Sequence, residues 1–265
     1  MSDRLATFRQ LHTHKGQPLL LPNAWDAGSA RLFESLGAKA IATTSAGVAW
    51  ALGYADGGKM PADVAIQLAA NVARVLTVPL SVDIENGYSD EPAQVAETVL
   101  RLIDAGAVGI NLEDGQKPAA LLAGKIEKIK AECAKRGVDI FVNARTDVFL
   151  AGLVDKPARV TETLSRAALY TAAGVDGLFV PAVVEPEQIK AIVADISLPL
   201  NVLAWEGLPN AAELGKLGVS RLSAGSGIPQ ALWAQAEQMA KGFLEGGRSE
   251  DLKGQMAYSQ LQGLF

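Results

Sequence analysis

A short apolar run followed by a segment of helical periodicity recurs along the whole chain. The apolar runs are Pro18 to Asn23, Ala40 to Ser45, Pro79 to Glu85, Gly109 to Asp114, Ile140 to Arg145, Gly177 to Pro181, Leu200 to Ala204 and Arg221 to Gly225. Strands that are apolar on both faces and separated by helices are typical of a buried parallel sheet. Eight such units, with no glycine fingerprint after the first run, predict a closed (β/α)8 TIM barrel of the α/β class.

Helical periodicity fills the segments between these runs. The expected helices are Ala27 to Gly37, Ala62 to Leu76, Pro92 to Ala105, Ala119 to Arg136, Pro157 to Ala173, Pro186 to Ile196, Asn210 to Leu217 and Pro229 to Glu245. Most of them begin at Asp, Glu or Pro and end at Gly. No linker divides the chain, so we expect one barrel domain over residues 1–246. Residues 247–265 would form a helical tail that serves assembly.

Composition excludes several classes of partner. The 265 residues carry a net charge of −5 and no run of Lys and Arg, which argues against binding to nucleic acid. No apolar stretch is long enough to cross a bilayer, and the first ten residues lack the apolar core of a signal peptide. The single cysteine, Cys133, cannot form an intramolecular disulfide. We therefore expect a cytoplasmic protein that binds a small molecule and neither nucleic acid nor a membrane.

Acidic side chains gather where the third and fourth runs end. Period-two alternation predicts that Asp83 and Glu85 share one face, with Glu113 at the end of the next run. Barrel active sites lie at these strand ends, and carboxylates so close together repel one another unless a cation neutralises them. Mg²⁺, or alternatively Mn²⁺, fits such an all-oxygen cluster. The other interpretation is that these acids cap the following helices, as we expect for Asp114 and Asp90.

The remaining chemistry is defined by Arg145 and by the positions of the histidines. Arg145 ends the fifth run, where its guanidinium would bind a substrate carboxylate or phosphoryl group, or would balance the acids. Both histidines, His12 and His14, precede the first run, which argues against a Ser-His-Asp hydrolase and a His-ligated zinc enzyme. No lysine ends a run, which argues against a Schiff-base aldolase.

Six motifs occur together in a specific order. They are Leu21-Pro22-Asn23-Ala24-Trp25-Asp26, Thr44-Ser45-Ala46-Gly47-Val48-Ala49, Leu52-Gly53-Tyr54-Ala55-Asp56, Asp83-Ile84-Glu85-Asn86-Gly87-Tyr88, Leu112-Glu113-Asp114 and Asn143-Ala144-Arg145. This combination resembles the isocitrate lyase / phosphoenolpyruvate mutase superfamily. The resemblance implies a Mg²⁺ site, formed mostly through waters, at Asp56, Asp83, Glu85 and Glu113. It implies substrate binding by Trp25, Ser45, Ala46, Gly47, Arg145 and Asn201, with Arg145, Glu113 and Asp56 as catalytic residues.

The resemblance also implies an activity and an assembly. The expected enzyme is a Mg²⁺-dependent lyase that cleaves a C–C bond in a small α-keto or 2-hydroxy dicarboxylate through an enolate. Its subunits would form dimers or tetramers by exchanging the eighth helix. The loop Gly115 to Ala120 lacks the Lys-Lys-Cys-Gly-His motif of lyase members, which argues against isocitrate cleavage by the usual route.

Two alternatives remain open. The first is P–C bond chemistry, of the phosphonopyruvate hydrolase or the carboxyphosphonoenolpyruvate or phosphoenolpyruvate phosphonomutase type. The second, from another class, is a non-catalytic barrel that binds a keto acid.

Overall fold

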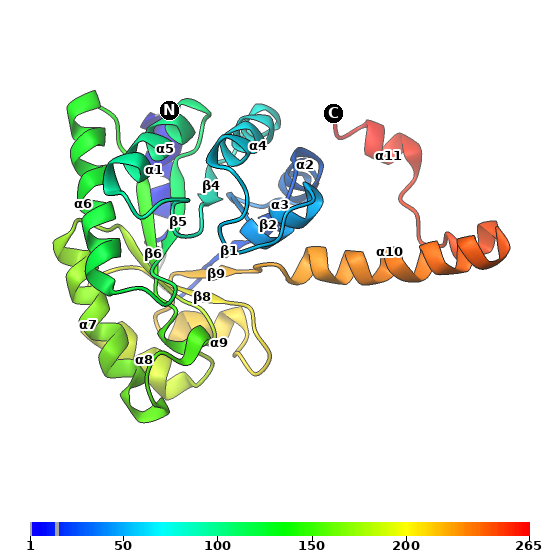
Figure 1. Ribbon diagram of the computed structural model, residues 1–265. Coiled ribbons are helices and arrows are strands. Elements are labelled where there is room, and N and C mark those ends of the chain that lie inside the picture. The colour runs from blue at the N-terminus through cyan, green and yellow to red at the C-terminus, as the bar shows by residue number, and fades with distance from the viewer. Residues whose placement is uncertain (1, 14–15) are drawn as a thin grey trace.

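Nine parallel strands form a nearly closed barrel in the computed structural model, which describes residues 2–13 and 16–265 (Figure 1). The strands are β1 (Leu19–Leu21), β2 (Asn23–Ala24), β3 (Ile41–Thr43), β4 (Leu80–Asp83), β5 (Gly109–Glu113), β6 (Phe141–Arg145), β7 (Gly177–Val180), β8 (Leu200–Leu203) and β9 (Arg221–Ser223). The sheet order is β1-β9-β8-β7-β6-β5-β4-β3-β2. This arrangement with its surrounding helices confirms the predicted TIM-barrel α/β fold.

The first predicted strand is interrupted at Pro22. Proline lacks the backbone N–H that a ladder requires, so the chain forms β1 before it and β2 after it. β1 pairs with β9 through Leu19 and Arg221, whereas β2 pairs with β3 through Asn23 and Ala42. One broken segment therefore joins both edges of the sheet, which explains why eight predicted runs give nine strands.

The eight predicted helices are present with shifts of a few residues at their ends. They are α2 (Ala27–Ser35), α4 (Ala62–Val75), α5 (Pro92–Asp104), α6 (Ala119–Arg136), α7 (Arg159–Ala172), α8 (Pro186–Asp195), α9 (Ala211–Lys216) and α10 (Gly227–Gly246). None of the helices within the described ranges is long and apolar enough to cross a membrane.

Further helices lie outside these predictions. They are α1 (Ser2–Leu11), α3 (Ser45–Ala51), α11 (Tyr258–Gln262), a π-helix over Val148–Gly152 and 3-10 turns over Lys156–Ala158 and Ser249–Asp251. The small residues after Thr44 start α3, where the N–H of Val48 donates to the carbonyl of Thr44 at 2.9 Å. Small side chains thus permit a helical turn directly after β3.

Helix α1 covers the N-terminal end of the barrel, opposite the strand ends that carry the acids. Phe8 on α1 is fully buried and packs edge-on against Phe141 at the start of β6, with ring centroids 5.3 Å apart. A Cβ atom at Gly109, the first residue of β5, would lie 2.8 Å from the Phe8 ring. Glycine at this position therefore lets α1 approach the strands closely.

His12 follows α1 and is buried with these aromatic rings. Its ring stacks on Phe141 at a centroid distance of 4.5 Å, and its Nδ1 lies 2.7 Å from the carbonyl oxygen of Phe8. Its Nε2 has no hydrogen-bond partner within residues 2–13 and 16–265. Burial, and next the charge of Arg221, lowers the pKa of His12 from 6.5 to about 3. The imidazole is therefore neutral in the folded protein at neutral pH. His14 lies outside the described residues.

This neutral histidine predicts a stability that depends on pH. Below pH 6.5 the unfolded chain binds a proton at His12 that the folded protein does not bind until about pH 3, so acid favours unfolding. At pH 5 this linkage removes about 2 kcal/mol of unfolding free energy. Urea titrations at pH 7.5 and pH 5 give the free energy of unfolding at each pH. Between these two values the His12→Phe variant should lose about 2 kcal/mol less unfolding free energy than the wild type. The same loss in both proteins would show that His12 does not carry this linkage.

Candidate active site

A cavity of about 190 Å³ opens among the carboxyl ends of the strands. It is lined by Asn23, Thr44, Ser45, Ala46, Asp56, Asp83, Asn111, Arg145, Leu150, Phe179, Pro181, Leu203, Trp205, Ser223, Gly225 and Ser226. Strand ends from around the barrel supply most of these residues, because parallel strands direct their carboxyl ends to one mouth.

The predicted site residues divide into two groups. Asp56, Asp83, Arg145, Ser45 and Ala46 line the cavity. The other predicted residues, Trp25, Gly47, Glu85, Glu113 and Asn201, do not line it. Two residues of this second group contact residues that line the cavity: Glu113 pairs with Arg145, and Asn201 donates to Ser223.

Asp83 ends β4 and lies within a backbone hydrogen-bond network. Its Oδ1 accepts from the N–H of Glu85 at 3.1 Å, and its carboxyl also accepts from the N–H of Ser45 at the start of α3. Burial raises the pKa of Asp83, the charge of Arg145 opposes that shift, and Asp56 reinforces it. An acid whose charged form is disfavoured by burial is therefore part of the cavity wall.

Glu85 departs from the predicted alternation with Asp83. β4 ends at Asp83, and Glu85 has a φ of 52°, in the left-handed region that few residues other than glycine adopt. The Oε2 of Glu85 accepts from the N–H of Gly58, while its buried Oε1 has no partner in the part of the chain that the structure describes. Burial raises the pKa of Glu85 to about 7. The negative charges of Asp56 and Asp83 add to this shift, whereas the hydrogen bond from Gly58 opposes it.

Arg145 joins two acids beside the cavity. Its Nη1 lies 2.7 Å from Oε2 of Glu113, and its Nε and Nη2 donate to the two carboxyl oxygens of Asp147 at 2.7 and 3.0 Å. Burial nevertheless raises the pKa of Glu113 to about 8. The charge of Arg145 opposes this shift, and the charges of Asp83 and Asp147 add to it. Arg145 therefore balances acids while its side chain lines the cavity, so both of its predicted roles are compatible with its position.

Asp147 was not identified from the sequence. The signal was the spacing of Arg145 and Asp147, two residues apart at the end of a strand, which places both on one side of the chain.

Asp114 is not the helix cap that we predicted. The helix that follows, α6, begins at Ala119 after Pro118, so Asp114 is too far from its first turn. Its buried carboxyl accepts from the N–H of Asp147 at 2.9 Å, from Arg166 at 2.9 Å and from the Tyr170 hydroxyl at 2.6 Å. Asp114 thereby ties the chain after β6 to α7.

Asp90 does not cap a helix either. The N-cap position of α5 is occupied by Glu91, and Asp90 instead forms ion pairs with Lys117 and Lys125. Lys117 is held in this way on the loop after β5.

A layer of buried amides lies at and beneath the floor of the cavity. Asn143 donates to Asn111 at 2.9 Å and to Asn201 at 3.0 Å, and Asn201 donates to Ser223 at 3.0 Å. Arg221 is fully buried and donates to Ser223 at 3.2 Å and to Asn111 at 3.3 Å. Asn201 therefore lies below the cavity and contacts it through Ser223. Polar residues in the middle of apolar runs were the signal for this layer.

Trp25 and Gly47 lie beside the cavity. The Trp25 ring packs edge-on against Phe33 of α2 at a centroid distance of 6.1 Å. A Cβ atom at Gly47 would lie 3.1 Å from both Trp25 and Pro229 and 2.7 Å from Thr44. Gly47 thus lets α3 pack closely against the start of α10.

The carboxylates do not form a cage for a directly coordinated ion. Among residues 2–13 and 16–265, no group of three or more His, Cys, Asp or Glu side chains is arranged to hold a metal. The acids at the mouth therefore lie in a looser cluster, partly joined by Arg145.

Comparison with known proteins gives the relationships of this chain. The family described as phosphoenolpyruvate phosphomutase matches residues 8–244. The relative named "Uncharacterized protein Rv1998c", from Mycobacterium tuberculosis (strain ATCC 25618 / H37Rv), is 40% identical over 260 residues, covering 97% of this chain and 95% of that protein. The 2-methylisocitrate lyase of Escherichia coli (strain K12) is 29% identical over 209 residues, covering 74% and 69% of the two chains.

A solved structure extends these relationships. The Burkholderia cenocepacia J2315 protein named "putative phosphonomutase" is 41% identical, covers 89% of this chain and 98% of its own, and superposes with a TM-score of 0.83. The family match over residues 8–244 spans the whole barrel. The chain belongs to the phosphoenolpyruvate mutase family, within the isocitrate lyase / phosphoenolpyruvate mutase superfamily.

Proposed function

We propose that this protein is a Mg²⁺-dependent lyase that cleaves a C–C bond in a small α-keto or 2-hydroxy acid through an enolate. The observation that carries this proposal is the cluster of Asp83, Glu85 and Glu113, in which Oε1 of Glu85 is buried without a partner among the described residues and Arg145 is already paired with Glu113 and Asp147. Family membership supports the reaction class, since relatives include 2-methylisocitrate lyase and oxaloacetate decarboxylase.

The residues present fit a divalent cation. Oε1 of Glu85 is a buried oxygen without a partner among the described residues, and burial together with repulsion between the acids raises the pKa values of Glu85 and Glu113. The donors are all oxygens, and the open arrangement suits Mg²⁺, which keeps several of its waters. Asp56, Asp83, Glu85 and Glu113 would hold the ion mostly through those waters, and Mn²⁺ could replace it. When bound, the cation supplies positive charge beside the oxygens on which an enolate concentrates its negative charge.

The chain's own groups bind and orient the substrate. Arg145 lines the cavity with a planar guanidinium that suits a carboxylate. Ser45, Ala46 and Gly47 form the first turn of α3, where backbone N–H groups lack intrahelical acceptors. The N–H of Ser45 donates to Asp83, and the N–H groups of Ala46 and Gly47 can bind the same carboxylate as Arg145. Asp56 has an exposed side chain at the cavity wall, from which it can exchange a proton with solvent.

P–C bond chemistry is the second candidate, supported by 41% identity to the structure named as a phosphonomutase. Charge favours the first candidate, because a phosphonate brings extra negative charge to a wall that contains Asp56 and Asp83. A barrel that only binds a keto acid remains the alternative from another class. The loop over residues 115–118 contains neither cysteine nor histidine, which supports that alternative.

The reaction can be identified with a panel of 2-oxo acids, 2-hydroxy acids and phosphonates, incubated with Mg²⁺ and followed by mass spectrometry. We expect C–C cleavage that stops on chelation of the metal. Asp83→Asn should lower kcat/KM by about 100-fold or more, because it removes a negative charge from the metal site.

Asp63→Asn is the matched control, since Asp63 pairs with Arg101, does not line the cavity and should leave activity unchanged. Full activity of Asp83→Asn would contradict the proposed site. Phosphate release or P–C rearrangement would select the second candidate, and tight binding without any product would select the binding barrel.

We propose in addition that α10 is exchanged between subunits. Figure 1 shows α10 extending away from the barrel, and its one buried residue is Pro229 at its start. Leu232, Trp233 and Phe243 are among its exposed apolar side chains. A helix with exposed apolar residues needs a partner surface.

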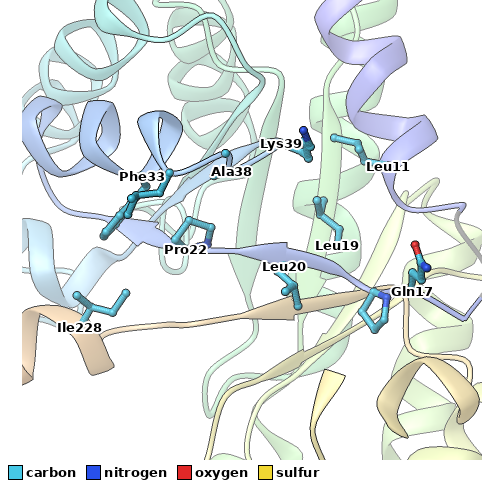
Figure 2. A pocket seen from close by; sticks show the side chains of 12 residues that line it. Leu11, Gln17, Leu19, Leu20, Pro22, Phe33, Ala38, Lys39 and Ile228 are labelled. Carbon is cyan, nitrogen blue, oxygen red and sulfur yellow. The ribbon is translucent and has the colours of Figure 1, made fainter. Parts of the chain in front are cut away.

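The barrel offers such a surface on its outer wall. A groove of about 750 Å³ runs along β1, and Figure 2 shows side chains from β1, α2 and the start of α10 around it. Leu20 of β1 is 55% exposed in this groove, although a barrel strand normally has a helix over its outer face. The α10 helix of a second copy would cover it, giving dimers that can pair into tetramers.

Light scattering after size-exclusion chromatography tests this assembly. The wild type should have a mass of two or four times 27.7 kDa. Leu20→Glu should shift the protein toward the monomer, because it places a charge in an apolar interface. Gln238→Glu on α10 is the control and should keep the wild-type mass. A wild-type protein of 27.7 kDa would contradict helix exchange.

A further inference from the structure

We infer that the substrate is a 4-hydroxy-2-oxo monocarboxylate whose C4 carries a small alkyl or aryl substituent. Cleavage of its C3–C4 bond leaves the bonding electrons on the pyruvate enolate, C4 leaves as an aldehyde, and the 4-hydroxyl proton passes to a carboxylate at the mouth. This inference rests on the proposed function and narrows its substrate class. It replaces the dicarboxylate that the family resemblance implies.

The cavity has two chemically different sides. Asp83 and Arg145, which end β4 and β6, and Asp56 from the segment between α3 and α4 make one side charged. The residues that line the cavity at the ends of β7 and β8 are apolar, namely Phe179, Pro181, Leu203 and Trp205. Phe179 lies beside Arg145, whose guanidinium carbon is 6.0 Å from its ring centroid, and the uncharged Ser223, Gly225 and Ser226 follow next to Leu203. β7 and β8 pair directly, with Val180 opposite Val202, so the four apolar residues form one continuous apolar wall.

The supply of positive charge limits the number of carboxylates that the cavity can bind. Within the described ranges, Arg145 is the one cationic side chain that lines the cavity, and it already contacts Glu113 and Asp147. A first carboxylate can use Arg145 and the proposed divalent cation. A second carboxylate at the far end would lose water against Leu203 and Trp205 without gaining a charged partner, which is costly.

The apolar wall continues from the interior to the rim. Phe179 is 5% exposed, whereas Leu150 and Trp205 are 39% and 49% exposed. An apolar substituent lying along this wall would cover the exposed parts of both rim residues. The cavity volume of about 190 Å³ restricts that substituent to a few carbon atoms.

Two unreactive oxamates of equal shape test the inference by calorimetry in the presence of Mg²⁺. N-isobutyl oxamate and N-carboxymethyl oxamate share the planar 2-oxo acid group and differ in the tail, which ends in two methyl groups or in a carboxylate. For the wild type we expect the isobutyl compound to have a Kd lower by about tenfold or more. Trp205→Arg should reduce this ratio to about one or invert it, because the new cation pairs with the second carboxylate. Trp205→Phe is the matched control and should keep the wild-type preference.

The outcomes separate this inference from the proposed function. Equal or tighter binding of the carboxymethyl compound to the wild type would overturn the inference, even if the protein cleaves C–C bonds. A preference for the isobutyl compound that Trp205→Arg abolishes would support it, even if no substrate in the panel is cleaved. Failure of both oxamates to bind would overturn the inference together with the proposed keto-acid site.

Discussion

The pairing of one guanidinium with two carboxylates at the barrel mouth is the interaction on which the rest of the site depends. Arg145 connects Glu113 on β5 to Asp147 in the chain after β6. Asp114 supports this connection from below, because it accepts a hydrogen bond from the backbone of Asp147 and binds Arg166 on α7. The strand ends, the following loop and an outer helix are thereby held together. Burial raises the pKa values of Asp83, Glu85 and Glu113, so the charged forms of these acids are disfavoured unless a cation binds beside them.

The barrel interior is organised in layers that isolate this charge. Phe8, His12 and Phe141 fill the N-terminal end with aromatic rings. Above them, Arg221 donates to Asn111 and the asparagine amides bond to one another, while the buried Nη1 of Arg221 has no partner among the described residues. Burial lowers the pKa of Arg221 to about 9, and the charge of Asp83 opposes that shift. The acidic mouth therefore lies above a polar layer, with the apolar end of the barrel farthest from it.

Much of this organisation follows from the sequence, because parallel strands bring their carboxyl ends to one place. The spacing of apolar runs was sufficient to predict the barrel, and the acids that end those runs predicted the mouth. Glu85 shows where this reasoning stops. Strict alternation would place it beside Asp83, but a positive φ turns the chain after β4, and the carboxyl contacts Gly58 instead. Local backbone conformation of this kind is set by tertiary contacts that periodicity does not contain.

Two other features could not be read from periodicity. Asn201 lies in a polar layer below the cavity, because its neighbours Asn143 and Ser223 offer the partners that its amide needs. α10 has the apolar content of a barrel helix, yet it does not cover the groove beside Leu20. A helical pattern indicates that an apolar face must be buried. The pattern is identical whether that face packs on its own barrel or on another copy of the chain.

The central claim is that the acids at the mouth bind a divalent cation beside the cavity. Crystals grown with Mn²⁺ and oxalate, examined by anomalous diffraction at the manganese edge, test it most directly. The account predicts one strong anomalous peak among Asp56, Asp83, Glu85 and Glu113, with water molecules between the ion and most of these carboxylates. A peak at another place, or an oxalate bound in the cavity with no manganese beside it, would contradict the claim.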